Sequence, residues 1–351
     1  MKIAVLVSGG VDSSVALARL HEQGHEVTAF YLKIWLEDEL SFLGDCPWEE
    51  DLSFVRALCE QLSIPLQVVP LQEAYRDRIV SYTINEVRAG RTPSPDVLCN
   101  ARIKFGAFLE AIDSSYEKVA SGHYGQIRQA ADGSYELFCS PDEVKDQTYF
   151  LSHLSQAQLS RILLPIGHMT KQEVREEAQR YLVPSRDRKD SQGICFLGKI
   201  SFTEFIEHYL GTQAGDIIEE ETGDLLGSHN GFWFHTIGQR HGLRLSGGPW
   251  YVVRKDTATN AVFVSRRYHA EDKKRDAFVM RDVHFIGQRP ELSTVSMKVR
   301  HGPERVMAEL KPLADGRYAV LLAKRDQGLA PGQFAVMYNG DVCLGSGVID
   351  D

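Results

Sequence analysis

A glycine-rich turn near the start of the chain, in the stretch VLVSGGVDSS that begins at Val5, has the composition of a phosphate-binding loop. An apolar, β-branched run precedes it and apolar residues at helical spacing follow it, so we expect a strand before the turn and a helix after it. Gly9 and Gly10 permit a sharp turn whose backbone N–H groups, with the helix N-terminus, can surround an anion. Ser8 and Ser13 add hydroxyl donors. A serine-capped turn that binds no ligand is the alternative interpretation.

The order of residues in this turn separates it from two common nucleotide-binding loops. It lacks the lysine of a Walker A loop and the glycine spacing of a dinucleotide-binding fingerprint. The pattern Ser-Gly-Gly-x-Asp-Ser resembles the PP-loop of ATP pyrophosphatases, which split ATP into AMP and pyrophosphate and so activate an oxygen atom by adenylation. Asp12 either caps the helix or holds Mg²⁺ on the phosphates, and the sequence leaves both roles open.

Two of the six cysteines have surroundings that favour a reactive thiolate. Cys99 lies in GRTPSPDVLCNARIKF, where prolines disfavour regular structure and positive charge comes from Arg91, Arg102 and Lys104. Nearby positive charge lowers the pKa of a thiol and makes its nucleophilic form available. Cys195 follows a polar loop with a basic flank in RKDSQGICFLG, although its apolar neighbours would also suit a buried strand. An ATP-activating loop and two reactive thiols together predict a thiolation, in which adenylation makes an oxygen a leaving group and sulfur replaces it.

The other four cysteines have no comparable setting. Cys59 lies on the apolar face of a predicted helix, and Cys139 and Cys343 lie in strand-like segments, so we expect inert core residues there. Acidic neighbours would raise the pKa of Cys46. Because no C-x-x-C pair occurs, we expect neither a zinc ribbon nor a secreted disulfide scaffold, and we assign no metal-ligand residues.

Strand-like and helix-like segments alternate through the first third of the chain, which predicts a parallel sheet with its ligand site at the carboxyl ends of the strands. The glycine turn follows the first strand, Leu32 lies near the end of the second, and Gly122 and His123 follow a later one. The expected strands cover 3–7, 25–35, 65–71 and 117–124, and the expected helices cover 52–62, 74–88 and 171–182.

We expect this α/β part to span 1–200. After it, the length and type of the predicted segments change twice. Short segments broken by glycine predict a small mixed α+β domain over 201–275. Six strand-like pieces then predict an antiparallel barrel or sandwich over 276–351. Asp315-Gly316 and Asn339-Gly340 lie between apolar runs as two-residue hairpin turns would.

Composition limits the possible partners and compartments. The net charge of −9 disfavours a nucleic-acid partner unless cations gather locally, as they do in RYLVPSRDRKD and SRRYHAEDKKR. From charge alone, a solvated surface that binds nothing is the favoured interpretation of both clusters. No apolar run approaches membrane-spanning length, and no signal peptide is expected at the start. We therefore expect a cytoplasmic enzyme with no membrane partner.

A series of segments in a fixed order resembles the tRNA-specific 2-thiouridylases, the family called MnmA in bacteria and TrmU in mitochondria. They are SGGVDSS, GRTPSPDVLCNARIKF, SGHYG, KDQTYFL, KDSQGICF, HTIGQRHGL and APGQFAVMYNGDVCLGSGVI, and they cover essentially the whole chain. The resemblance implies an α/β PP-loop ATP pyrophosphatase domain of the adenine nucleotide alpha hydrolase type. It also implies an enzyme that uses ATP and Mg²⁺ to adenylate the C2 oxygen of the wobble uridine in glutamate, lysine and glutamine tRNAs. Sulfur from a cysteine desulfurase or a relay protein, carried as a persulfide, would then replace that oxygen.

The same resemblance implies roles for individual residues. Cys195 would carry the persulfide, and Cys99 would be the nucleophile that frees the sulfur and leaves a transient Cys99–Cys195 disulfide. The implied ATP contacts are Leu6, Val7, Ser8, Gly9, Gly10, Val11, Asp12, Ser13, Leu32 and Gly122. The implied contacts to the tRNA anticodon stem-loop are Ser94, Pro95, Asp96, His123, Lys145, Asp146, Gln147, Arg300, His301 and Gln333.

Two of these positions depart from the family pattern. Ser94 stands where the family has Asn in its Asn-Pro-Asp segment, which meets the target base, and Leu32 stands where many members have Met.

Three other functions remain open at this point. The chain could be a PP-loop ligase of a small metabolite, which would need neither Cys99 nor Cys195. It could transfer sulfur through an iron–sulfur cluster with both cysteines among its ligands. It could also be a non-catalytic tRNA-binding module that keeps a vestigial loop.

Overall fold

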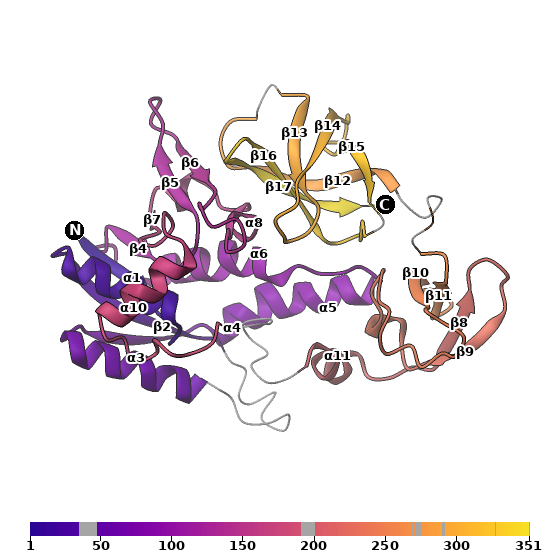
Figure 1. Cartoon of the computed structure of the whole chain (residues 1–351), viewed down its shortest axis with the longest axis horizontal. Helices are drawn as coiled ribbons and strands as arrows, with labels where there is room; N and C mark the ends of the chain where they lie inside the picture. The colour runs from indigo at the N-terminus through magenta and orange to yellow at the C-terminus, as the bar shows by residue number, and fades with distance from the viewer. Residues whose placement is uncertain are drawn as a thin grey trace.

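The computed structural model describes residues 1–34, 48–190, 201–268, 270, 275–289, 292–326 and 328–350, and three kinds of architecture follow one another along the chain (Figure 1). A parallel sheet flanked by helices comes first, a small four-stranded mixed sheet follows, and a closed antiparallel barrel comes last. The expected fold class, an α/β domain followed by a small mixed domain and an antiparallel barrel, is confirmed.

The first sheet consists of parallel strands in the order β3-β2-β1-β4-β7. The central strand β1 is buried on both faces, which explains its uninterrupted apolar sequence. Because side chains alternate along a strand, Ile3 and Val5 enter one core while Ala4 and Leu6 enter the other. The strands are β1 Lys2–Leu6, β2 Glu26–Lys33, β3 Leu66–Pro70, β4 Lys118–Ala120 and β7 Ile162–Leu163.

The helices of this domain divide between the two cores. α1 (Val11–Glu22), α3 (Trp48–Leu62) and α10 (Lys171–Arg180) supply residues to the core that contains Ile3 and Val5. The others lie on the opposite face or near the barrel: α4 Gln72–Tyr75, a π-helical stretch Arg76–Val80, α5 Ser81–Arg88, α6 Pro95–Cys99, a second π-helical stretch Asn100–Ala107, α7 Phe108–Ala111, α8 Thr148–Leu151 and α9 Gln156–Leu159.

The segment around Cys99 is helical, so the expectation that prolines keep it irregular is wrong. Pro95 occupies the first turn of α6, where a helix needs no N–H from it and its fixed φ suits the helix. Ser94 is the residue that precedes the helix, and Cys99 ends it with only 3% of its surface exposed.

The central region is a small sheet in the order β10-β11-β8-β9 with its own core around Val252, Val262 and Trp250. Its elements are α11 Phe202–Leu210, β8 Gly215–Glu219, β9 Leu225–His229, a 3₁₀ turn Phe232–Phe234, β10 Tyr251–Asp256 and β11 Ala261–Ser265.

The last six strands close into a barrel in the order β12-β15-β14-β13-β16-β17, because β17 also pairs with β12. They are β12 Arg275–Phe285, β13 Thr294–Lys298, β14 Val306–Pro312, β15 Tyr318–Asp326, β16 Phe334–Asn339 and β17 Val342–Asp350. The expected hairpin turns shift in register. Asn339 pairs with Val342, so Gly340-Asp341 is the two-residue turn, and Asp315-Gly316 lies in a longer loop between Pro312 and Tyr318.

The barrel is joined to the first domain by a sheet extension and by a shared core. A hairpin of the first domain, β5 (Gln126–Gln129) and β6 (Tyr135–Phe138), pairs with β17 of the barrel. Leu98 and Leu137 of the first domain belong to the same apolar core as Phe334 and Val348 of the barrel. The two parts therefore pack as one continuous body.

Three cysteines expected in the core are buried there. Burial raises the pKa of Cys59 to about 11, and burial also raises the pKa of Cys139 and of Cys343. Cys46 lies outside the described residues. No helix in the described ranges is both long and apolar enough to cross a membrane.

Candidate active site

The glycine turn connects β1 to α1 as the sequence predicted, and its first glycine, Gly9, is required by its surroundings. Gly9 has φ +74°, and a Cβ there would lie 2.5 Å from the carbonyl oxygen of Asp51. Gly10 precedes α1, and its carbonyl oxygen accepts a hydrogen bond from the Ser14 hydroxyl at 2.8 Å. The Ser13 hydroxyl accepts from the Ser8 N–H at 3.2 Å. The turn thus places the N-terminus of α1, which favours anions, directly after the carboxyl end of β1.

Two further residues expected at ATP lie on the strands that flank β1. Leu32 is the second-last residue of β2. Gly122 follows β4, which pairs with β1 on the side opposite to β2. A Cβ on Gly122 would lie 2.6 Å from the Ser13 nitrogen and 2.7 Å from the Asp12 carbonyl carbon. The backbone after β4 therefore packs directly on the start of α1, at the edge of the sheet where a ligand is expected.

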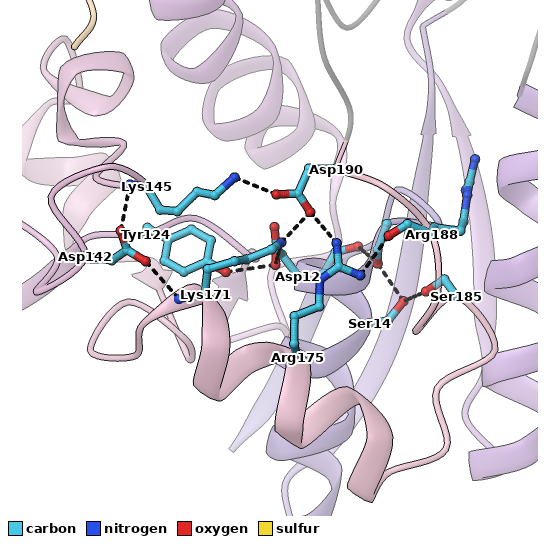
Figure 2. Close-up of polar contacts among 12 residues, drawn as sticks. Asp12, Ser14, Tyr124, Asp142, Lys145, Lys171, Arg175, Ser185, Arg188 and Asp190 are labelled. Carbon is cyan, nitrogen blue, oxygen red and sulfur yellow. Dashed lines mark hydrogen bonds and ion pairs between the residues drawn. The ribbon is translucent and has the colours of Figure 1, made fainter. Parts of the chain in front are cut away.

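Asp12 does not cap α1, because Gly10 is the capping residue and no side chain makes a capping hydrogen bond there. Its carboxylate accepts from the Tyr124 hydroxyl at 2.9 Å and pairs with the Lys171 ammonium at 2.7 Å (Figure 2). Lys171 is the first residue of α10, so a cation from a distant part of the chain lies beside the turn.

A second carboxylate, Asp190, forms ion pairs with three cationic side chains of this region. Figure 2 shows Lys145 and Arg175 pointing at it together with Lys171, at 2.5, 2.6 and 2.8 Å. Burial alone would raise the pKa of Asp190, but hydrogen bonds from Lys145 and Lys171 outweigh burial and hold it well below its usual range. Asp190 remains an anion and keeps three positive side chains near the turn.

These cations supply positive charge, which the turn itself lacks because it contains no Lys or Arg. Arg188 also reaches it, since its guanidinium donates to the Gly9 carbonyl oxygen at 3.0 Å and pairs with Asp51 at 2.8 Å. In the sequence, Arg188 stands out only as part of a basic cluster, and Lys171, Arg175 and Asp190 were not predicted at this site. The available signal was the position of Asp190 in KDSQGICF, five residues before Cys195.

The surroundings fit triphosphate and Mg²⁺ by their chemistry. Phosphate oxygens suit the α1 N-terminus and the Lys171 ammonium, and Mg²⁺ prefers one or two carboxylates together with phosphate oxygens. Asp12 supplies a carboxylate from the first turn of α1, directly after the glycines. Within the residues that the structure describes, no three His, Cys, Asp or Glu side chains gather as a metal site made by protein alone would require.

The residues expected at the target base lie around the start of α6. Asp96 is mostly buried, and burial raises its pKa, although the nearby Lys104 opposes that rise. His123 forms a hydrogen bond between Nδ1 and the Ser121 hydroxyl at 2.8 Å. Burial, and then the charge of Lys104, lower its pKa well below the usual value, so its ring is neutral.

Expected tRNA contacts of the barrel lie beside residues of the first domain. The His301 ring stacks on Phe150 with centroids 4.6 Å apart, and Gln333 follows a loop whose Pro331 carbonyl oxygen accepts from the Thr92 N–H at 2.8 Å. Arg300 forms an ion pair with Asp326. Residues far apart in the sequence thus lie at one junction between the two parts.

Two of the expected tRNA contacts, Asp146 and Gln147, have side chains that bind other residues of the protein. The Asp146 carboxylate is 3% exposed and pairs with the equally buried Lys298 at 3.2 Å, so it faces away from solvent. The Gln147 side chain accepts from the Tyr124 N–H at 2.9 Å. Cys195 and the other residues of 191–200 lie outside the described residues.

Comparison with known proteins covers the whole chain. A family model described as "tRNA methyl transferase HUP domain" matches residues 1–199, one described as "tRNA methyl transferase PRC-barrel domain" matches 203–266, and one described as "Aminomethyltransferase beta-barrel domain" matches 275–349. The chain is 45% identical to tRNA-specific 2-thiouridylase MnmA of Parabacteroides distasonis, over 100% of this chain and 99% of that protein. It is 46% identical to tRNA-specific 2-thiouridylase MnmA 2 of Bacteroides fragilis, over 99% of this chain and 100% of that protein.

Solved structures are more distant. U34-tRNA thiolase NcsA of Methanococcus maripaludis, solved with its [4Fe-4S] cluster, has 16% identity and a TM-score of 0.36 over 59% of this chain and 63% of that chain. Likeness at this level carries no functional argument. The family descriptions speak of methyl transfer, whereas the relatives matched from end to end are named for thiolation, and the end-to-end identity is the more specific guide.

Proposed function

Since the chain belongs to the tRNA-specific 2-thiouridylase family, we propose that it replaces the C2 oxygen of the wobble uridine in glutamate, lysine and glutamine tRNAs with sulfur. The observation that carries this proposal is the β1–α1 turn, where Asp12 and the Lys171 ammonium lie 2.7 Å apart in front of a helix N-terminus. Such a site suits the binding and cleavage of a nucleoside triphosphate.

The first step of the proposed reaction is adenylation. The uridine C2 oxygen attacks the α-phosphorus of ATP, the bond from that phosphorus to the bridging oxygen breaks, and pyrophosphate leaves. The turn from Leu6 to Ser13 would hold the phosphates, while Leu32 and Gly122 would contact the adenosine. Mg²⁺, when bound, neutralises phosphate charge, and Asp12 is the carboxylate that would hold it. Lys171 and Arg175 would bind the departing pyrophosphate.

The second step is sulfur transfer. A cysteine desulfurase or a relay protein supplies the terminal sulfur of a persulfide on Cys195. That sulfur attacks C2, and AMP leaves with the original oxygen. The Cys99 thiolate then attacks the Cys195 sulfur, which breaks the bond to the new 2-thio group and forms a Cys99–Cys195 disulfide. A thiol reductant restores both cysteines, as in the cytoplasm, where we place the enzyme.

The target uridine must leave its stack before C2 can be reached. We assign the pocket to Ser94, Pro95 and Asp96, with the neutral His123 nearby. Burial raises the pKa of Asp96, although the charge of Lys104 opposes that rise, and its carboxyl group lies at the start of α6 beside Ser94 and Pro95. Lys145, Arg300, His301 and Gln333 would contact the anticodon stem-loop around it.

The experiment is nucleoside mass spectrometry of unmodified glutamate tRNA after incubation with the protein, ATP, Mg²⁺ and a persulfide source. Cys99→Ser and Cys195→Ser should each abolish 2-thiouridine while ATP still binds. Cys59→Ala is the matched control, because Cys59 is buried on α3 with a raised pKa. Thiolation that persists in either serine variant would remove that cysteine from the reaction.

A further inference from the structure

The carboxylate of Glu86 joins the first domain to the barrel. Glu86 lies in α5 with 7% of its surface exposed, and it accepts hydrogen bonds from the Arg91 guanidinium through both oxygens, at 2.5 and 2.7 Å. The same carboxylate accepts from Arg281 of β12 at 3.3 Å. One buried anion therefore lies between two arginines that come from different parts of the molecule.

Arg91 leads directly into a main-chain contact with the barrel. The next residue, Thr92, donates its N–H to the Pro331 carbonyl oxygen at 2.8 Å. Gly332 has φ +93°, and a Cβ there would lie 2.8 Å from the Thr92 carbonyl oxygen and 3.0 Å from the Arg91 Cβ. The barrel loop therefore lies against this segment with no space for a side chain at Gly332.

On the barrel side, strand β17 holds the main chain of Gln333. The Ile349 N–H donates to the Gln333 carbonyl oxygen at 2.8 Å, and the Gly332 N–H donates to the Ile349 carbonyl oxygen at 2.9 Å. Asp350, the last residue of β17, forms an ion pair with Arg281 at 3.7 Å. The strand that fixes Gln333 is thus tied to the arginine that binds Glu86.

These contacts form a closed ring that crosses twice between the first domain and the barrel. One crossing is the main-chain bond from Thr92 to the loop before Gln333, and the other is the pair of Glu86 with Arg281. Ser94, the first residue expected at the target base, follows Thr92 by two residues. Because rotation about one crossing would break the other, the ring fixes the segment that leads to Ser94 relative to Gln333.

The charge of Glu86 is what holds the second crossing together. Its side chain is 9% exposed, and those of Arg91 and Arg281 are 32% and 27% exposed. Removing the anion from such a group leaves the partly buried cations unpaired and facing each other, which is costly away from water. The barrel would then be free to turn about the bond between Thr92 and Pro331.

We propose that Glu86 is a positioning residue that holds the barrel loop of Gln333 at a fixed distance from Ser94, Pro95 and Asp96, so that one tRNA contacts both. The inference rests on the proposed function. Glu86 acts through Arg91 and Arg281 and touches neither the tRNA nor the reacting atoms. Its role is to remove a freedom of movement that the tRNA would otherwise have to restrict on binding.

The test compares Glu86→Gln with Glu22→Gln. Glu22 of α1 also binds one arginine through both carboxylate oxygens, at 2.7 and 2.9 Å, but its partner is Arg180 of α10 instead of a residue of the barrel. Each variant removes one carboxylate charge from an ion pair between two elements. Formation of 2-thiouridine is measured over a range of tRNA concentrations, together with the affinity for a non-hydrolysable ATP analogue and the melting temperature.

Glu86→Gln should raise KM for tRNA about tenfold, the size of effect expected from one lost charged hydrogen bond. It should leave kcat and the affinity for the ATP analogue within about twofold, and Glu22→Gln should leave all three values unaltered. A merely structural role would lower the melting temperature and the amount of active enzyme, which lowers kcat and does not raise KM. Equal KM values for tRNA in the two variants would overturn the inference.

Arg281→Gln opens the same crossing from the barrel side and should also raise KM for tRNA about tenfold, so it decides the question if Glu86→Gln does not fold. In a Glu86→Gln background it should add no further rise, because the crossing is already open. Two rises that multiply would contradict the inference.

The unaltered protein separates this inference from the proposed function. If it forms no 2-thiouridine at all, the proposed function fails and the inference fails with it. If it is active and the Glu86 and Arg281 variants keep its KM for tRNA, only the inference fails.

Discussion

Lys171 and Asp12 form an ion pair of 2.7 Å that joins the first residue of α10 to the first turn of α1. Lys171 is only 16% exposed and lies 2.8 Å from Asp190 as well, so one ammonium separates two carboxylates. The PP-loop contains no lysine of its own. This pair supplies a positive charge to the loop from a helix that begins 159 residues further along the chain.

Replacing Lys171 with Met should raise KM for ATP and lower tRNA-dependent AMP release, together by about 10- to 100-fold in kcat/KM. The phosphates lose a cation, and Asp12 and Asp190 are left facing each other without it. AMP formation measured against ATP concentration checks this. Lys311→Met, on the exposed side of β14, is the control and should change neither value. An unaltered kcat/KM in the Lys171 variant would remove this lysine from the ATP site.

Gly122→Ala should weaken ATP binding about tenfold or more, because the new Cβ would lie 2.6 Å from the Ser13 nitrogen and push the start of α1 away from β4. Gly287→Ala is the matched control, since a Cβ there meets nothing within 4 Å. Titration calorimetry with a non-hydrolysable ATP analogue measures both. Equal affinities in the two variants would show that the contact between Gly122 and α1 does not shape the site.

The pair of Asp146 and Lys298 predicts a large effect on stability. Both side chains are 3% exposed, so Lys298→Met leaves a buried carboxylate without its cation and should cost about 3–5 kcal/mol in the free energy of unfolding. Denaturant titration measures the loss. Asp146→Asn combined with Lys298→Met should restore part of it, because neither variant side chain is charged. A loss no larger than that of Lys311→Met would contradict the account.

Because Lys255 is buried in the central region, we expect the free energy of unfolding to depend on pH. Burial lowers its pKa to about 8, whereas an unfolded lysine has a pKa of about 10.4. Between these values the unfolded chain binds more protons, so this residue's contribution to stability rises with pH. Lys255→Met should therefore be more stable than the unaltered protein at pH 7, and that advantage should shrink as the pH rises above 8. Urea denaturation of both proteins across this range is the check, and an advantage independent of pH would refute the shifted pKa.

The parts of the structure that depend on local sequence were predictable. The β1–α1 turn could be predicted from Gly9, Gly10 and the apolar periodicity on either side of them. The six barrel strands could be predicted because turn residues separate them. The closure of β12 on β17 and the pairing of β17 with β6 depend on contacts between distant segments, which a periodic pattern does not encode.

Contacts between distant segments also limited what could be predicted of the candidate site. Asp12 could be proposed from the sequence because it lies in the PP-loop pattern, and Gly122 because it follows a predicted strand. Lys171 and Asp190 were missed because each is an ordinary charged residue in the sequence, and only the fold brings Lys171, at the start of α10, to Asp12 and Asp190. Cys99 was placed in an irregular segment because two prolines precede it, but Pro95 at the first turn of a helix starts α6 instead of preventing it.

The central claim is that ATP activates the same oxygen that sulfur replaces. The direct test uses a glutamate tRNA whose wobble uridine carries ¹⁸O at C2, incubated with the protein, unlabelled ATP, Mg²⁺ and a persulfide source. The phosphate of the AMP produced should contain one ¹⁸O atom for each 2-thiouridine formed. AMP without the label, formed in step with 2-thiouridine, would show that ATP activates another group and would contradict the account.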